Sequence, residues 1–451
     1  MKSTAESLDS HSPRIWDQLR MVSAPVYIAV MLFAMSTWIS VVGIWVEMPL
    51  LVHALPESWK LPSYLVIIIQ CANIGPASYA IWVKMRQRKQ QAGNENEIQQ
   101  QQKQQRHSYI DAEVAVSLII ILTAIVSMLM LSLFWDHTLV VASVNRSVAL
   151  LTLVCVASLS CCTSSVVFLP YMARFPSVYI SAYYFGQGLC GLVPGLLGLA
   201  QVADQEAQCQ NETTINNTLT NITFDITEVS TVYSSSPRFS VSAFFALITV
   251  LLCVSAAAFC CLSFVKRCRS EMAAVSSASD QKLDNMAETS ATSEAEGVLE
   301  GRPANPDSDI VQSDSAVPVI ETTVILLQRR RYISLYVTIC IISALWNGIL
   351  PATQTYTCLP YGHIVYRLAV CLSWVVSPLA TLPNMLAPTS SLSLITGLGM
   401  LASMIAALHL LLAAQSPYPV LQGRVFGQIM VVSLIVLKFT ALVTGQIAGQ
   451  L

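Results

Sequence analysis

The side chains in this sequence that could do chemistry are mostly amides placed inside long apolar runs. Asn73 lies in QCANIGP, with Gln70 three residues earlier and therefore on nearly the same helical face. Asn347 lies in WNGILP, and Gln187 lies in YYFGQGLCG. A side-chain amide both donates and accepts hydrogen bonds, so it can recognise the polar edge of an uncharged, flat solute. The alternatives are helix distortion or an interhelical hydrogen bond, worth about 0.6 kcal/mol on average in membrane proteins.

Charged and aromatic residues accompany these amides. Glu47 follows Trp45 at the end of an apolar run, where an acid is costly unless something uses it. We expect Glu47 to accept hydrogen bonds from solute hydroxyls, the alternative being a solvated carboxylate at a helix end. Arg367 is expected to line the pathway or to pair with Glu47 as a gate, the alternative being a side chain that snorkels to the interface. Tyr184 can stack on a flat ring or pack in the core. The candidate substrate site therefore comprises Trp45, Glu47, Gln70, Asn73, Tyr184, Gln187, Asn347 and Arg367.

Motifs for catalysis, cofactors and metals are missing from the sequence. It contains no GxxxxGK[ST] phosphate loop, no HExxH and no paired acids in the apolar runs. Most of the 13 cysteines lie inside apolar runs, where a free thiol packs as a small hydrophobe. We therefore predict no enzyme, no catalytic residues, no cofactor and no metal site.

Composition predicts a membrane protein. The 451 residues are 54% hydrophobic and only 11% charged, whereas soluble domains carry about 25% charged residues. A soluble fold with this composition would lack a polar surface. The net charge of −2 argues against a nucleic-acid partner. The expected partners are the lipid bilayer and a transported solute, with no obligate protein partner evident.

Apolar runs of about 18 to 25 residues predict membrane-spanning helices, since helices satisfy their own backbone hydrogen bonds in lipid. About ten such runs are present, giving an all-α polytopic fold. They lie near 24–46, 61–83, 112–133, 147–168, 178–200, 239–265, 332–350, 364–382, 391–414 and 425–447. Two tracts without core-forming composition, 90–105 and 271–317, are predicted to be disordered.

The long polar tract divides the predicted spans into six plus four. We expect an N-terminal cytoplasmic segment over 1–21, a first helical bundle over 22–265 and a second over 332–451. A disordered cytoplasmic loop, 266–331, joins the bundles, and a central pathway lies between them. An extracellular glycosylated loop is expected over 202–238.

Two signals predict the orientation. Lysine and arginine cluster in the flanks that lie on one side if the N-terminus is cytoplasmic, as the positive-inside rule requires. The opposite side carries glycosylation sequons at Asn145, Asn211, Asn216 and Asn221. Cys209 and Cys358 are the two cysteines expected in extracellular loops, so either a disulfide joins them or both remain free thiols.

Several long strings resemble a known family. They are GIWVEMPLL (Gly43–Leu51), LPESWKLPSYL (Leu55–Leu65), QCANIGP (Gln70–Pro76), CTSSVVFLPYMARFP (Cys162–Pro176), GLVPGLLGLAQ (Gly191–Gln201), NGILPATQTYTCLPYG (Asn347–Gly362) and LAVCLSWVVSPLA (Leu368–Ala380). This ordered set is similar to the animal riboflavin transporters, solute carrier family 52. The resemblance implies a plan similar to major-facilitator or nucleoside-transporter folds, and riboflavin as the solute.

Together these features predict a plasma-membrane transporter that takes up riboflavin by alternating access of two bundles. Riboflavin is an uncharged, flat ring system with a uracil-like edge and a polyhydroxyl tail, which suits amides and aromatic faces. A nucleoside or another flat neutral solute is the alternative within transporters. A ligand receptor that does not transport is the alternative outside that class.

Overall fold

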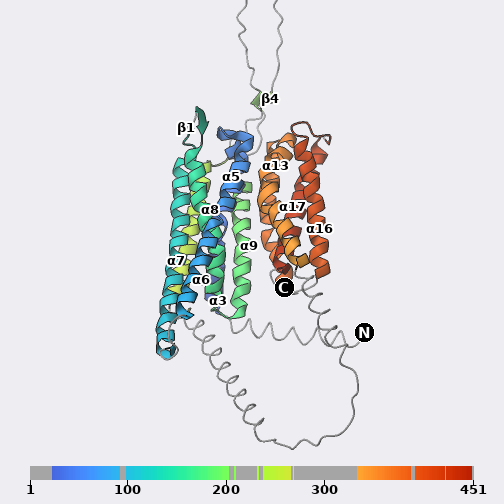
Figure 1. Cartoon of the computed structure of the whole chain (residues 1–451). Coiled ribbons are helices and arrows are strands. Elements are labelled where there is room, and N and C mark those ends of the chain that lie inside the picture. The colour runs from blue at the N-terminus through green and yellow to red at the C-terminus, as the bar shows by residue number, and fades with distance from the viewer. Residues whose placement is uncertain are drawn as a thin grey trace, which may run out of the picture.

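The computed structural model consists of long helices arranged in two groups that lie side by side (Figure 1). It describes residues 23–91, 98–141, 143–202, 208–209, 231–232, 237–265, 268, 333–386, 392–421 and 423–448. The first-half helices, α3 to α10, form the blue-to-yellow group, and the second-half helices, η3 to α17, form the orange-to-red group.

The first half contains helices α3 (Ala24–Met35), α4 (Ile39–Ala54), η1 (Ser58–Lys60), α5 (Leu61–Cys71), α6 (Ile74–Gln91), α7 (Ile98–Phe134), α8 (Val148–Met172), α9 (Ser177–Ala200) and α10 (Val241–Phe264). It also contains the strands β1 (Leu139–Val141), β2 (Val144–Arg146), β3 (Gln208–Cys209) and β4 (Thr231–Val232). The second half contains η3 (Leu345–Ile349), α13 (Leu350–Cys358), η4 (Leu359–Tyr361), α14 (His363–Val375), α15 (Ser377–Leu386), α16 (Leu392–Ala414) and α17 (Arg424–Ala448).

Length and apolar composition make most of these helices candidate membrane spans. Within the described residues, eight helices are long and apolar enough to cross a membrane, and the bent pair α3–α4 makes nine if it is counted as one span. Helix α9 occupies the position of the expected fifth span and has 24 residues, but its glycine- and tyrosine-rich sequence keeps it out of that set. The all-α polytopic class is confirmed, while the count of ten and the division into six plus four stay predictions.

Three of the long helical segments are interrupted, and two of the interruptions contain predicted site residues. Helices α3 and α4 meet at an angle of 54°. The second span breaks between α5 and α6, where the backbone N–H of Asn73 donates to the backbone carbonyl of Gln70 at 3.2 Å. In the second half, Asn347 lies within the π-helical turn η3. Such wide turns are rare in proteins, and those that occur are often found at functional sites.

The core is divided between one cluster that joins both halves and others inside each half. The joint cluster includes Met48 of α4, Phe244 of α10 and Tyr366 of α14. A second cluster within the first half is aromatic, with the rings of Phe33 and Phe168 4.7 Å apart. The two groups of helices are therefore held together by continuous apolar packing.

A glycine-rich face of α9 packs against α14 and α15. A Cβ atom placed on Gly188 would lie 2.8 Å from the Cα of Pro378, and one on Gly191 would lie 2.8 Å from the carbonyl oxygen of Trp374. Small residues at such positions let membrane helices approach closely. This close contact forms part of the seam between the two halves.

At the end of the molecule that carries β1 and β2, a buried acid fixes the connections. Glu57 accepts hydrogen bonds from the backbone nitrogen of Ser147 at 2.7 Å and from its hydroxyl at 2.6 Å. This ties the α4–α5 connection to the start of α8. The β1–β2 hairpin beside it pairs Leu139 with Arg146. We call this end the hairpin end.

Candidate functional site

Three of the predicted amide residues meet at the seam. The side-chain nitrogen of Gln70 in α5 donates to the backbone carbonyl of Asn347 in η3 at 2.9 Å. The side chain of Asn73 donates to the side-chain oxygen of Gln70 at 3.2 Å and to its backbone carbonyl at 3.3 Å. The two interrupted helices thus face each other, and their residues are 277 positions apart in the chain.

The amide of Asn347 has free hydrogen-bonding capacity. Asn347, Asn73 and Gln70 are all exposed rather than covered by protein. Within the described part of the chain, the side chain of Asn347 makes no hydrogen bond, since its contact with Gln70 uses the backbone carbonyl. A solute at this point meets a donor and an acceptor on one side chain.

Glu47 lies in a second polar group, with Arg367 and Gln201. Its side chain is 1% exposed, and neither carboxylate oxygen has a hydrogen-bond partner among the described residues. Arg367 is close enough to attract the carboxylate, but its guanidinium donates instead to the side-chain oxygen of Gln201 at 2.6 Å and to the carbonyl of Gly198 at 3.3 Å. Glu47 and Arg367 therefore lie near each other without a direct ion pair, so the interpretation of the two as a paired gate is not seen in this structure.

The sequence analysis did not predict Gln201 as a member of this group. Gln201 ends α9 and is fully buried, and its side-chain nitrogen donates to the carbonyl of Phe239 at 3.0 Å. Its side-chain oxygen accepts the hydrogen bond from Arg367. A polar residue at the end of a predicted span was the available signal, but span ends carry polar residues for many reasons.

A buried lysine adds a cationic group to the seam. Lys438 in α17 is 1% exposed, and its Nζ atom lies 3.9 Å from the ring centroid of Trp346 and 3.4 Å from that of Trp374. Cation–π contacts of this kind are worth about 2 kcal/mol or more when desolvated. Among the described residues the ammonium has no carboxylate partner. Trp346 precedes Asn347, so this aromatic cage adjoins the amide site.

The remaining predicted residues lie farther along the helices. Trp45 in α4 is half-buried and packs beside the Ile69 side chain, next to Gln70. Gln187 in α9 donates to the hydroxyl of Tyr183 at 3.3 Å. Tyr184 is 40% exposed and makes an edge contact with Tyr183 at 5.9 Å between centroids. No described contact joins Gln187 or Tyr184 to the amides of α5 and η3.

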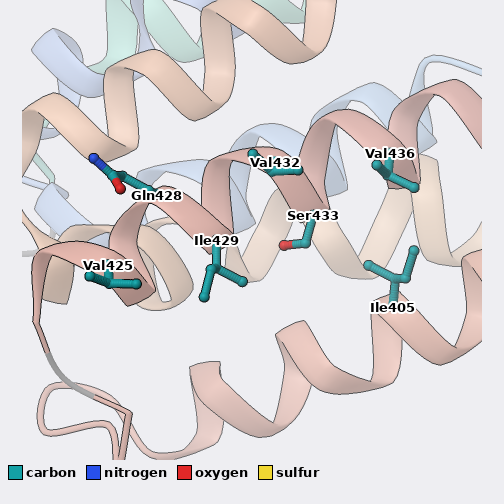
Figure 2. Close-up of a pocket in the computed structure, with 7 residues that line it drawn as sticks. All are labelled: Ile405, Val425, Gln428, Ile429, Val432, Ser433 and Val436. Atoms are coloured by element: carbon teal, nitrogen blue, oxygen red, sulfur yellow. The ribbon is translucent and has the colours of Figure 1, made fainter.

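The larger cavity in the second half lies away from all of these residues. Figure 2 shows this groove, of about 400 Å³, between α16 and α17, with Ile405 facing Ser433 and Val436. The other lining residues are Val425, Gln428, Ile429 and Val432. Ser433 is already bonded to His409 Nε2 at 3.0 Å. A groove this apolar on a membrane helix pair lacks the polar groups that orient a ligand.

The cavity beside η3 is much smaller. Trp346 and Leu350 help to line it, and its volume is about 10 Å³, which is about the space that one water molecule needs. Gln70, Asn73 and Asn347 do not line this cavity, and all three are exposed.

Several predictions on the loops fall outside the described residues. These are the sequons at Asn211, Asn216 and Asn221, the segment 1–21, and most of the segments 202–238 and 266–331. The tract 90–105 differs, because only 92–97 lie outside the described residues. Helix α6 continues to Gln91 and α7 begins at Ile98, so the prediction of disorder is wrong for the helical residues 98–105. Asn145 lies in β2 and is exposed, as a glycosylated residue must be. Cys358 is a buried free thiol, and the side chain of Cys209 is outside the described residues, so the structure gives no support to the expected disulfide.

Comparison with known proteins decides the family. Residues 22–444 match the family described as solute carrier family 52, riboflavin transporter. This chain belongs to solute carrier family 52. It is 32% identical over 418 residues to riboflavin transporter member 3-A of Danio rerio, covering 90% of this chain and 84% of that protein. It is also 32% identical over 406 residues to member 1 of Homo sapiens, covering 90% and 82%, and 30% identical over 435 residues to human member 3, covering 90% and 85%.

The predicted resemblance to solute carrier family 52 is thereby confirmed. Solute carrier family 52 is a family of multi-pass membrane transporters, so the chain is a transporter-family protein and not an enzyme. Among the described residues, no group of three or more histidine, cysteine, aspartate or glutamate side chains is arranged to hold a metal ion.

Proposed function

We propose that this solute carrier family 52 chain takes up riboflavin across the plasma membrane by alternating access. One observation carries the proposal: the hydrogen bond from Gln70 in α5 to Asn347 in η3, which brings two interrupted helices together across the seam. Transporters commonly place their substrate sites where discontinuous helices expose backbone and amide groups near the middle of the membrane.

The chemistry of this point suits riboflavin. The uracil-like edge of the ring needs groups that donate and accept, which the amides of Asn73 and Asn347 supply. The flat ring needs aromatic or apolar faces, which Trp346 and the half-buried Trp45 offer. The ribityl hydroxyls need acceptors, and both carboxylate oxygens of Glu47 lack hydrogen-bond partners.

The closed seam supports a cycle in which the two halves move. Passage of the ring between the halves requires the Gln70–Asn347 contact to be replaced by solute contacts, because this hydrogen bond joins α5 to η3 across the seam. A solute that binds the separated halves more tightly than the closed ones shifts that equilibrium in proportion to the difference in affinity.

The orientation is also part of the proposal, with the N-terminus cytoplasmic and the hairpin end extracellular. It predicts that Asn145, exposed in β2, carries a glycan. Asn145→Gln is expected to increase the mobility of the protein on a denaturing gel relative to the unchanged chain, and treatment of both with a glycosidase is expected to abolish the difference. The proposed orientation would be wrong if Asn145→Gln left the mobility unchanged and if a label on the hairpin reacted only from the cytoplasmic side.

The deciding experiment is uptake of labelled riboflavin by cells that express the chain, compared with cells carrying an empty vector. Saturable uptake that is reduced by flavin analogues and not by uridine is the expected result. Reduction by uridine alone would favour the nucleoside alternative. Binding at the cell surface without accumulation would favour the receptor alternative. If cells that display the protein neither bound nor took up riboflavin, the proposal would be wrong.

A further inference from the structure

Two histidines from opposite halves face each other at the hairpin end of the seam. His53 lies in the last turn of α4, and His363 is the first residue of α14. Nε2 of His53 and Nδ1 of His363 are 2.6 Å apart, and the ring centroids are separated by 4.0 Å. The two residues are 310 positions apart in the chain, and both are exposed.

This arrangement has the donor set of a metal site. Neutral imidazole nitrogen is a preferred ligand of Zn²⁺, with bonds of about 2.0–2.1 Å. Two nitrogens at a tetrahedral angle around such an ion lie about 3.3 Å apart. The present separation of 2.6 Å therefore has to widen by only about 0.7 Å when the shared proton is replaced by the ion. Exposure of both rings leaves room for water at the remaining positions.

We propose that His53 and His363 form a two-ligand site for a borderline transition-metal cation such as Zn²⁺, and that the bound ion clamps α4 to α14. Because zinc centres in proteins normally have three or four protein ligands, this one is weaker and its occupancy depends on the metal concentration outside the cell. The sequence pattern gives no hint of it, since the ligands lie in separate motifs.

The clamp acts on a part of the seam that is otherwise held by modest contacts. At the same end, the rings of Trp59 and Tyr356 meet edge to face at 5.6 Å, and the hydroxyl of Ser63 donates to the carbonyl of Ala352 at 3.2 Å. A metal ion that binds only the closed arrangement stabilises it by mass action. Inhibition of uptake rests on the proposed transport function, whereas metal binding does not.

The binding test uses the full chain purified with a tag that lacks histidine. Titration calorimetry with ZnCl₂ is expected to show a site that both His53→Gln and His363→Gln weaken by at least tenfold, since loss of even an outer-shell partner costs about 10–100-fold. Glutamine keeps a hydrogen-bonding group at the seam. His137→Gln is the matched control, because His137 is also exposed at the hairpin end but pairs with Asp136 at 3.2 Å.

A second readout separates the clamp from the transported solute. ZnCl₂ is expected to raise the thermal unfolding midpoint of the unchanged chain and of His137→Gln, and not of the two seam variants. In cells, ZnCl₂ is expected to inhibit uptake by the unchanged chain, reversibly with EDTA, and not by His53→Gln. Equal zinc affinity in all four proteins would overturn the site. Binding at the two histidines without any effect on midpoint or uptake would overturn the clamp.

Discussion

The glycine face of α9 allows a sharp test of how the two halves pack. In Gly188→Ala, the new Cβ atom would lie 2.8 Å from the Cα of Pro378 and 3.2 Å from its nitrogen. Those are backbone atoms of α15, so the helices themselves have to move apart. Overpacking of this kind costs about 1–3 kcal/mol, while alanine in a helix gains up to about 1 kcal/mol over glycine.

Gly397→Ala is the matched control for this substitution. Gly397 lies in α16, and a Cβ atom there would meet nothing within 4 Å. The control therefore keeps the helix-propensity gain without the steric cost. The difference between the two variants isolates the packing term, which we expect to be about 1–3 kcal/mol.

This difference is measured by heating each variant in detergent and determining, at each temperature, the fraction of protein that remains monodisperse. Gly188→Ala is expected to lose its monodisperse peak several degrees below the unchanged chain, and Gly397→Ala at or slightly above it. If Gly188→Ala withstood heat as well as Gly397→Ala, α9 would not pack against α15 as described, and the seam would have to be placed elsewhere.

Two further substitutions test buried groups outside the amide site. Glu57→Ala leaves the backbone and hydroxyl donors of Ser147 unpaired, so we expect a loss of about 1–3 kcal/mol per orphaned group, seen as a lower unfolding midpoint; an unchanged midpoint would refute the tie. Lys438→Met loses the ring contacts with Trp346 and Trp374 but also removes a buried charge that costs about 2.5–3.5 kcal/mol at the centre of a span. Its midpoint is therefore expected to stay close to that of the unchanged chain, whereas Lys438→Glu is expected to express poorly; the reverse order would show that the aromatic cage does not hold a cation.

Much of the architecture follows from local sequence. A run of about 20 apolar residues has few alternatives in a bilayer, so the candidate spans Ala112–Phe134, Val148–Met172 and Val241–Phe264 were predictable within a few residues. The helical extension of α7 back to Ile98 was not, because its glutamine-rich sequence has no apolar run. The packing glycines of α9 were predictable from their spacing, because residues three and four apart share a helix face. Family strings such as QCANIGP fixed the ancestry.

The site itself depended on contacts that no local pattern encodes. Asn73 and Asn347 were predictable as candidates because amides are unusual in spans, but their meeting through Gln70 depends on how α5 packs on η3. The pairing of His53 with His363 likewise depends on where two distant helix ends come together. A pair with Glu47 was one of the interpretations of Arg367, whereas in the structure its guanidinium donates to the side-chain oxygen of Gln201.

The most direct test of the central claim is equilibrium binding of riboflavin to the purified chain, followed by quenching of flavin fluorescence. The account predicts saturable quenching for the unchanged protein and at least about tenfold weaker binding for Asn347→Ala and for Asn73→Ala, since a lost hydrogen bond at a desolvated site costs about 1–3 kcal/mol. The matched control Asn145→Ala alters an exposed residue of the β1–β2 hairpin and is expected to bind normally. Equal affinity in all four proteins would contradict an amide-lined site between α5 and η3.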